Sequence, residues 1–525
     1  MRRPSGTKRN TIRLCNAGSG RPSQSCGDGW ELRVMIEIEV QKNKYAYNVY
    51  HLVKAFFPGE EVVQKINGKQ ETLAAIRMPE GSCFSIAPEG TNPDAGDVRD
   101  IQREKREVTR RVYRILSDYT GRKLAWGILT GVRPTKLAMQ RLEKETEAGG
   151  HPDVDVQKRV VSYLEEEYFV SREKAVLAYQ VARREQELLS RLDCRNGFSL
   201  YAGIPFCPSV CSYCSFSSSP LEKWKDRVDA YLDALIKEIR ALSKMAAGRR
   251  LDTVYIGGGT PTTLEPEQLE RLLGSISEAF DLEGALEFTV EAGRPDSITE
   301  EKLAVLKQYP VSRISINPQT MQQKTLDLVG RRHTVQQTAD AFHMARALGF
   351  ANINMDLIAG LPGETAEDMR DTIQQIEELR PDSLTVHSLA IKRAARMGQE
   401  GRTADLHTEI SRMVDDAAAG AARMGLVPYY LYRQKNIAGN FENVGYAEVD
   451  KAGIYNILIM EEKQTILAAG AGASTKFVLP EKTSTGNGKE TDLIRVENVK
   501  NIEEYISRID EMIERKAKAA DRSAV

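Results

Sequence analysis

From residue 197 onward, short apolar runs alternate with longer amphipathic stretches. The short runs have the length of β-strands, and the longer ones carry apolar residues at helical spacing. We predict strands at 199–206, 252–259, 287–293, 313–320, 352–360 and 383–390. Six strand-then-helix units in sequence predict a parallel sheet, because each crossover helix returns the chain to the same edge. Six units are too few for a closed barrel of eight. We therefore expect an α/β fold in which residues 197–400 form an open (β/α)6 partial TIM barrel.

The segments on either side have other patterns. Residues 31–97 contain ELRVMIEIEV and ETLAAIRM, which alternate apolar and polar positions, so we expect a small α+β domain there. Residues 98–196 form a charged region with helical periodicity, and 401–525 suggest a small α+β extension. Residues 1–30 are basic, rich in Ser and Gly, and lack the apolar core of a secretory signal. We expect a disordered tail, with a transit peptide or an early start codon as alternatives.

Composition narrows the class of protein. The chain has 525 residues, which suggests two or three domains, and is 41% apolar and 28% charged, as in ordinary globular proteins. A net charge of −1 gives no general attraction to nucleic acid or to anionic membranes. No run of 18 apolar residues predicts a membrane span. Seven cysteines, three of them clustered, suit a reducing cytoplasm and a metal or redox site. We expect a cytoplasmic monomer that does not bind nucleic acid.

The three clustered cysteines lie in the stretch CPSVCSYC, as Cys207, Cys211 and Cys214. Three thiolates on one loop can hold one corner of a compact cluster, whereas structural zinc takes four closed ligands, usually from two pairs. A [4Fe–4S] cluster usually takes four cysteines, so three would leave one iron free to bind a substrate or cosubstrate. A zinc site completed by a distant residue, or a coincidence of cysteines, remains as an alternative.

Further candidate residues lie at the predicted strand ends, where a barrel of this kind places its chemistry. The cysteines follow the first strand, and the glycines 257–259 end the second. Glu291 ends the third strand, Gln319 ends the fourth, and Asp356 lies late in the fifth. The topology therefore predicts that these side chains gather at one edge of the sheet.

CPSVCSYC and GGGTP resemble the cluster loop and the glycine motif of radical S-adenosylmethionine (SAM) enzymes. The resemblance implies a [4Fe–4S] cluster whose fourth iron chelates SAM, and one-electron cleavage of SAM to a 5′-deoxyadenosyl radical. YAGIPFCPSVCSYC, YIGGGTPTTL, FTVEAGRPDSI, SINPQT, VGRRHT and INMDLIAGLPGET resemble, block by block, the oxygen-independent coproporphyrinogen III oxidases over about 199–395. The form most similar is the longer Gram-positive-type branch with an extra N-terminal domain.

The resemblance also implies roles for individual residues, with one or two SAM molecules bound. The three cysteines would be the cluster ligands. Contacts to the cluster-bound SAM would come from Tyr201, Gly258, Glu291 and Ser474. A second SAM or substrate pocket would be lined by Tyr213, Gly259, Thr260, Gln319, Arg331, Asp356 and Ala390. Structural alternatives stay open: Asp356 as a paired buried acid, Arg331 as a surface charge, and Gln319 as a helix cap.

Two positions depart from the family pattern. Phe216 stands where the oxidases carry a further cysteine, and the related haem chaperones have an aromatic residue there. Those chaperones carry a His-Asn-x-x-Tyr-Trp-like motif, whose nearest match here is residues 442–447, with Glu442 in place of the histidine. His387 is the one histidine that we expect at a strand end near the site, either as a substrate contact or as a satisfied polar residue.

The resemblance implies an oxidoreductase that decarboxylates two propionates of coproporphyrinogen III to the vinyls of protoporphyrinogen IX, in haem biosynthesis. A haem-binding chaperone on the same scaffold, or a radical SAM enzyme with another substrate, remains as an alternative. The expected partners are a tetrapyrrole with carboxylates and an electron donor or acceptor protein. Cationic anchors for those carboxylates would be Arg331, Arg332 and Lys392.

Overall fold

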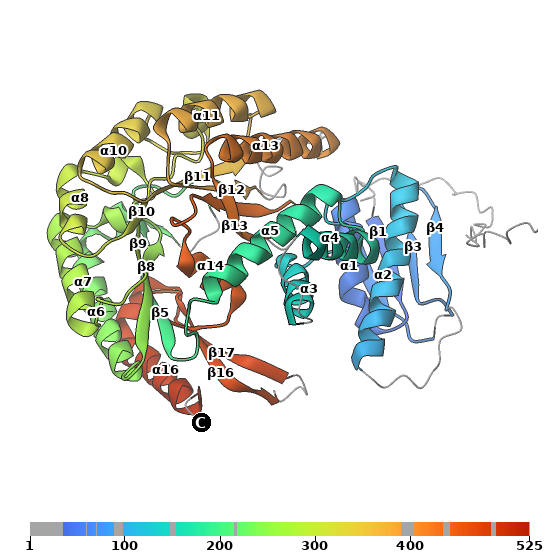
Figure 1. The fold of residues 1–525 in the computed structure, drawn as a ribbon, viewed down its shortest axis with the longest axis horizontal. Coiled ribbons are helices and arrows are strands. Elements are labelled where there is room, and N and C mark those ends of the chain that lie inside the picture. Colours follow the sequence, from blue (N-terminus) through green and yellow to red (C-terminus); the bar gives the residue numbers. More distant parts are fainter. Residues whose placement is uncertain are drawn as a thin grey trace, which may run out of the picture. The chain divides into compact units, whose positions relative to one another are not determined.

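The computed structural model describes residues 35–58, 60–69, 71–88, 98–147, 154–214, 218–389, 403–433, 441–484 and 490–523. It separates into two compact units (Figure 1). The first comprises Met1–Val176, Ala390–Lys392 and Arg433–Phe441, and the second comprises Leu177–Leu389, Arg393–Tyr432 and Glu442–Val525. The division falls inside helix α5 (Arg172–Leu189).

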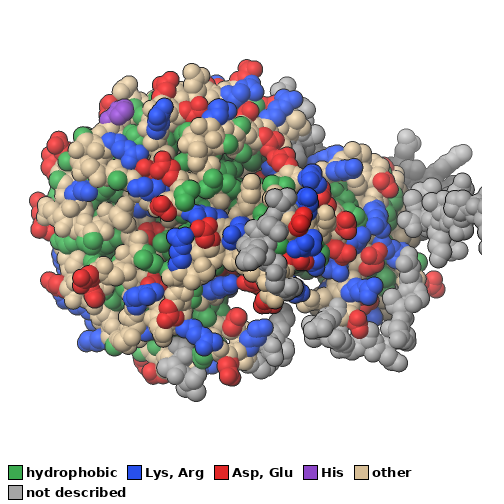
Figure 2. Space-filling view, in the orientation of Figure 1, with side chains coloured by type: hydrophobic (Ala, Val, Ile, Leu, Met, Phe, Trp, Pro, Cys, Tyr) green, Lys and Arg blue, Asp and Glu red, His purple; other side chains and the backbone are tan. Residues whose placement is uncertain are grey.

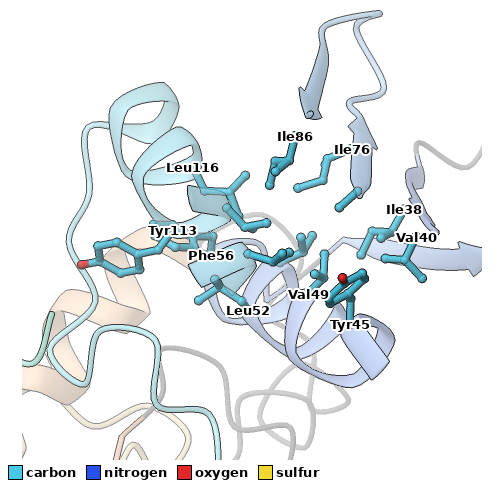
Figure 3. Close-up of a cluster of buried hydrophobic side chains, with 14 of the residues drawn as sticks. Ile38, Val40, Tyr45, Val49, Leu52, Phe56, Ile76, Ile86, Tyr113 and Leu116 are labelled. Atoms are coloured by element: carbon cyan, nitrogen blue, oxygen red, sulfur yellow. The ribbon is translucent and has the colours of Figure 1, made fainter. Parts of the chain in front are cut away.

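The first unit is built on a four-stranded sheet in the order β2-β1-β3-β4. Its elements are β1 (Met35–Val40), α1 (Asn43–Phe56), β2 (Glu61–Ile66), β3 (Ala74–Arg77), β4 (Cys83–Ile86), α2 (Val98–Thr120), α3 (Thr135–Glu147) and α4 (Val154–Tyr168). Strand β1 pairs in parallel with β2 and antiparallel with β3, and alternation along β1 buries Ile36, Ile38 and Val40. Helices α1 and α2 add Leu52 and Leu116 to the same apolar core (Figure 3).

The second unit contains an eleven-stranded sheet in the order β13-β14-β12-β11-β10-β9-β8-β5-β15-β16-β17. Its central strands are β5 (Gly197–Ile204), β8 (Arg250–Gly258), β9 (Glu287–Glu291), β10 (Arg313–Ser315), β11 (Ile353–Ala359) and β12 (Ser383–Ser388). All six are parallel and follow one another in sequence order. Strand β5 also pairs with β15, and β12 with β14, so the two ends of the six-stranded set do not meet. The predicted open (β/α)6 partial barrel is confirmed.

Five crossover helices form the outer layer around these strands (Figure 1). They are α6 (Val228–Met245), α7 (Pro266–Ala279), α8 (Glu300–Lys307), α10 (Val335–Ala347) and α11 (Ala366–Leu379), with the shorter α9 (Gln323–Leu328) before α10. Threonines 299, 334 and 365 cap the N-termini of α8, α10 and α11, since each side chain accepts a hydrogen bond from a backbone N–H of the first turn.

The C-terminal segment extends the sheet at both ends. It contains α13 (Thr403–Arg423), β13 (Val427–Tyr432), β14 (Asn443–Ala447), α14 (Ile454–Glu461), β15 (Thr465–Ala469), β16 (Ser474–Ser484), β17 (Glu490–Glu497), α15 (Ile502–Ser507) and α16 (Ile509–Ser523). Strands β13 and β14 continue the sheet beyond β12 in antiparallel fashion. Strand β15 joins β5 in parallel, with Leu467 opposite Leu200, and the β16–β17 hairpin follows it.

The molecular surface carries both signs of charge. Figure 2 shows basic and acidic side chains interspersed over the face in view, in keeping with the net charge of −1. Within the described ranges, no helix is both long enough and apolar enough to cross a membrane.

Candidate functional site

The three clustered cysteines lie on the loop that follows β5 in the second unit. This cluster loop, residues 205–214, begins with β6 (Phe206–Cys207), which pairs with β7 (Ser219–Pro220). The Cys214 N–H donates to the carbonyl of Cys211 at 3.0 Å, which closes a turn between them. All three thiols are partly buried. Residues 215–217 lie outside the described part of the chain, so the departure at Phe216 has no structural description.

Two side chains from neighbouring strand ends donate to these thiols. Thr260, two residues after β8, donates from Oγ1 to Cys207 Sγ at 3.4 Å. Arg294, three residues after β9, donates from Nη1 to Cys211 Sγ at 3.6 Å. Both residues are almost fully buried, with 1% and 3% of their surface exposed. The cluster loop is therefore held by hydrogen bonds to its sulfur atoms.

The thiols also interact electrostatically with one another. Burial raises the pKa of Cys207, and the negative charge of Cys214 raises it further, while the Thr260 hydrogen bond opposes both. The Arg294 guanidinium interacts electrostatically with Cys207 and Cys211. The described residues include no group of three His, Cys, Asp or Glu that is set around a single metal ion.

Two glycines at the end of β8 bring bare backbone against the first strand. Gly258 has φ +112°, and a Cβ there would lie 2.9 Å from the Ile204 carbonyl oxygen. A Cβ on Gly259 would lie 2.5 Å from the Phe206 carbonyl oxygen. Only glycine fits at these positions, since the obstructing atoms belong to the backbone.

Glu291, the last residue of β9, has an unusual carboxyl group. Its side chain accepts a hydrogen bond from the Tyr255 hydroxyl of β8. Burial raises its pKa to about 7, and the charge of Asp356 adds to that effect, against the opposing hydrogen bonds from Tyr255 and the Gly258 backbone. Tyr201 of β5 lies within electrostatic reach of the same carboxyl. The predicted contacts Tyr201, Gly258 and Glu291 are thus brought together.

An aromatic stack accompanies this carboxyl group. The Tyr255 ring stacks on Tyr455 of α14 at 4.5 Å between ring centroids, and Tyr201 lies 6.3 Å from each. Helix α14 is placed against the strands by Glu287, whose carboxylate accepts from the backbone N–H groups of Ile454 and Tyr455. A carboxylate is stabilised at this position because the first N–H groups of a helix lack partners within it.

Gln319 has an unusual backbone conformation and an unusual side-chain environment. Its φ is +70°, in the left-handed region that non-glycine residues seldom occupy. Its amide Oε1 is buried without a hydrogen-bond partner among the described residues. Its backbone N–H donates to the Asp356 carbonyl at 2.9 Å, so it lies beside β11. An unusual backbone and an unpartnered buried acceptor both favour a ligand contact over a helix cap.

Asp356 is the centre of a polar chain across three strands. It accepts from Asn354 Nδ2 at 2.7 Å, and its Oδ2 lies 3.7 Å from His387 Nε2 of β12. Tyr432 of β13 lies 3.3 Å from His387 Nδ1 through its hydroxyl. Although burial raises the pKa of Asp356, the His387 and Asn354 contacts outweigh it and hold that pKa below its ordinary value. The carboxylate is therefore ionised at neutral pH.

Arg331 lies inside the structure and is 4% exposed, so it is not a surface charge. Its Nη1 donates to the carbonyls of Asn317 and Pro318 at 2.9 and 3.1 Å, and its Nη2 to the Gly293 carbonyl at 3.2 Å. These bonds join the loops after β9 and β10. The adjacent residues 329–330 accept from the cluster loop, through the Ser212 N–H at 3.1 Å and Ser209 Oγ at 3.0 Å.

The other predicted contacts differ in their surroundings. Tyr213 packs against an apolar cluster of Val329, Ile358, Leu361 and Leu389. Ser474 begins β16 opposite Glu497, after the turn at Gly470. Ala390 and Lys392 lie outside the described residues. Their roles, like those of the other site residues, stay predictions.

Sequence reasoning missed Arg294, Tyr255 and Tyr455. The signal for Arg294 was present, because a cation three residues beyond Glu291 must lie near the same strand ends. Tyr455 gave no such signal, since it comes from a helix far along the chain.

The sequence is similar to a protein-family model and to several known proteins. The Radical SAM superfamily model matches residues 201–376. The oxygen-independent coproporphyrinogen-III oxidase-like protein HemZ of Bacillus subtilis is 41% identical over 74% of this chain and 77% of its own length. The heme chaperone HemW of Lactococcus lactis is 39% identical over 37% of this chain. The matched region spans about half of that relative's own length, 49%.

Among solved structures, coproporphyrinogen III oxidase (HemN) from Escherichia coli, described as a radical SAM enzyme, is 22% identical. The match covers 62% of this chain and 72% of that one, with a TM-score of 0.47. The family rests on the sequence match to HemZ rather than on this likeness. The chain belongs to the radical SAM superfamily, in the family of oxygen-independent coproporphyrinogen III oxidase-like proteins.

Proposed function

We propose that this protein is an oxygen-independent coproporphyrinogen III dehydrogenase. It would convert two propionate side chains of coproporphyrinogen III to vinyl groups, giving protoporphyrinogen IX. Each side chain would lose CO2, a hydrogen atom to the deoxyadenosyl radical and one electron to an acceptor protein. The observation that carries the proposal is the cluster loop with three thiols, hydrogen-bonded at two sulfurs and set beside two cramped glycines and a buried carboxyl. The relative of 41% identity is named for this activity only as oxidase-like, so the substrate itself is the proposal.

The residues present fit the cofactors of the superfamily, a [4Fe–4S] cluster and SAM. Cys207, Cys211 and Cys214 would hold the cluster, because thiolates are its ordinary ligands and two of these sulfurs already accept hydrogen bonds. Bare backbone at 258–259 leaves room for the close approach of a ligand. The bound pair supplies one-electron cleavage of the SAM sulfonium, and thereby the radical that removes a hydrogen atom from the substrate.

The chain's own groups would bind and orient SAM. Glu291, when ionised, accepts hydrogen bonds from ribose hydroxyls or an ammonium group, with Tyr255 fixing its orientation. Gln319 offers an unpartnered amide oxygen for the same purpose. Asp356 offers a carboxylate oriented by His387 and Asn354.

Substrate carboxylates need cationic partners. Arg331 donates to three backbone carbonyls, so we assign it to shaping the pocket rather than to forking onto a carboxylate. Arg332 is exposed and remains the candidate anchor within the described chain. Its guanidinium suits bidentate recognition of a carboxylate.

A haem chaperone is the other candidate, because relatives so named match part of the chain. The residues at the positions of the chaperones' His-Asn motif, Glu442 and Asn443, are buried in this protein where β14 packs beside β12. Glu442 is 2% exposed, and Asn443 is fully buried and accepts from the Ser388 N–H at 2.8 Å. Both residues are thus engaged in the packing between β12 and β14, which supports the enzyme over the chaperone.

An anaerobic assay tests the proposal. The reconstituted protein, with SAM, a reductant and coproporphyrinogen III, should yield 5′-deoxyadenosine, CO2 and protoporphyrinogen IX. SAM cleavage without CO2 would leave a radical SAM enzyme with another substrate. A haem titration run beside it should give no specific Soret shift that is lost in the variant His387→Ala.

A further inference from the structure

The side chain of Arg294 is clamped between an acid and the cluster loop. Asp296 accepts a bidentate pair of hydrogen bonds, from Nε at 2.8 Å and from Nη2 at 2.7 Å. The other edge of the guanidinium donates to Ser209 and Cys211. Its Nη1 lies 3.2 Å from Ser209 Oγ, 3.3 Å from the Ser209 carbonyl and 3.6 Å from Cys211 Sγ.

This clamp is buried and rigid. The side chain of Arg294 is 4% exposed and that of Asp296 is 16% exposed. Ser297 donates to the Arg294 carbonyl at 2.8 Å and lies 2.7 Å from the Thr262 hydroxyl, which fixes the turn that carries the arginine. Although burial raises the pKa of Asp296, the Arg294 hydrogen bonds and charge outweigh it and hold that pKa low. The turn therefore presents a fixed ion pair to the cluster loop.

We propose that Arg294, oriented by Asp296, is a positioning residue that aligns the cluster loop and raises the reduction potential of the cluster. The inference rests on the cluster of the proposed function but not on its substrate. The step concerned adds one electron to the cluster from a low-potential donor protein, with no bond formed or broken. Reduction adds negative charge, so a cation that donates to a ligand sulfur favours the reduced state.

The same turn couples the cluster to SAM. Glu291 and Arg294 lie three residues apart at the end of β9, and Arg331 binds the Gly293 carbonyl between them. A displacement of the turn would thus disturb the cluster loop and the carboxyl proposed to hold SAM together. Groups outside the metal ligands commonly orient those ligands in this way.

The test uses the full chain, reconstituted anaerobically, with the midpoint potential of the cluster measured by EPR-monitored titration. Arg294→Gln should keep the iron content and shift the midpoint to a more negative value. The equilibrium constant for reduction of the cluster should fall at least tenfold, which is about 59 mV for one electron. Arg294→Lys keeps the charge and should shift it less. Asp296→Asn keeps an oxygen that can accept from the guanidinium but removes a negative charge, so it should shift the midpoint in the opposite, positive direction.

Arg346→Gln is a matched control. Arg346 also pairs with an aspartate, Asp382, at 2.7 Å and donates to a backbone carbonyl at 3.0 Å, but it lies on α10 and touches no part of the cluster loop. It should leave the midpoint unchanged. If Arg294→Gln takes up no cluster, the midpoints of Arg294→Lys and Asp296→Asn decide.

The outcomes separate the two proposals. A wild-type chain that takes up no cluster would overturn the proposed function and this inference with it. If the wild-type chain takes up the cluster and all three variants have the wild-type midpoint, the inference alone is overturned. A shift in Arg346→Gln as large as that in Arg294→Gln would also overturn it, because the effect would then follow from any lost ion pair.

Discussion

The carboxyl of Glu291 gives the sharpest pH dependence that this structure predicts. With a pKa of about 7, its ionised fraction should rise about eightfold between pH 6 and pH 7.5. If only the ionised form accepts hydrogen bonds from SAM, the apparent Kd should fall by the same factor, since affinity scales with the competent fraction. Equilibrium dialysis of SAM against the anaerobic, cluster-loaded protein measures this directly.

Two other charged groups near Glu291 do not share that titration. Asp356 is ionised over the whole window, because its pKa is held below its ordinary value. The buried Arg313 stays cationic. Glu364 does titrate in the same window, since burial raises its pKa to about 7, but it bonds to Thr320 rather than to the Glu291 group.

Two variants assign the effect. Glu291→Gln should bind SAM with a Kd that no longer changes between pH 6 and pH 7.5, whereas Glu364→Gln should keep the wild-type slope. A wild-type Kd that is flat with pH, or a slope that survives in Glu291→Gln, would refute the reasoning. The opposite assignment, with the slope lost only in Glu364→Gln, would refute it as well.

The stability of the fold should fall with rising pH, whereas the affinity for SAM should rise. Between pH 4.5 and pH 7 the folded protein binds more protons at Glu291 than the unfolded chain, so the free energy of unfolding falls as pH rises through that window. The difference amounts to at most about 3 kcal/mol. Glu291→Gln should therefore be more stable than wild type at pH 8, and similar at pH 4.5, in denaturant unfolding.

Two further perturbations test the packing of the second unit. Gly259→Ala forces a Cβ to 2.5 Å from the Phe206 carbonyl oxygen. It should lower the free energy of unfolding by about 1–3 kcal/mol and weaken SAM binding at least tenfold. In the control Gly284→Ala the Cβ meets nothing within 4 Å, so both quantities should stay at wild-type values, and equal SAM affinities in the two variants would contradict the account. Lys516→Met leaves the fully buried Glu238 carboxylate without its cation and should cost about 3–5 kcal/mol in denaturant unfolding. The double variant Glu238→Gln/Lys516→Met should recover part of that loss, and a single variant as stable as wild type would rule out the argument.

Local pattern predicted the six central strands because each is apolar and bounded by turns. Their ends were less predictable. The fourth strand was expected over 313–320, but β10 ends at Ser315. Pro318 lacks an N–H for a ladder, and Gln319 adopts a left-handed backbone. No alternation of apolar and polar residues along the sequence indicates such an ending.

Long-range pairing was out of reach of the sequence. The sequence predicts a small α+β extension over 401–525, but the place of β15 beside β5, with Ala469 opposite Ala202, depends on contacts between distant segments. The same holds for Tyr455, which reaches the site from α14. The predicted cysteines, glycines and Glu291 lie together because parallel strand ends share one edge, whereas the partners of Arg331 follow from the loops.

The central claim is that Cys207, Cys211 and Cys214 hold a cluster that cleaves SAM. The most direct measurement is 5′-deoxyadenosine formed by the anaerobically reconstituted protein, compared between wild type, Cys211→Ala and the control Cys194→Ala, a half-buried thiol outside the loop. We predict product from wild type and from Cys194→Ala, and none from Cys211→Ala, which should keep its fold and lose its brown colour. Iron binding and SAM cleavage at wild-type levels in Cys211→Ala would contradict the claim.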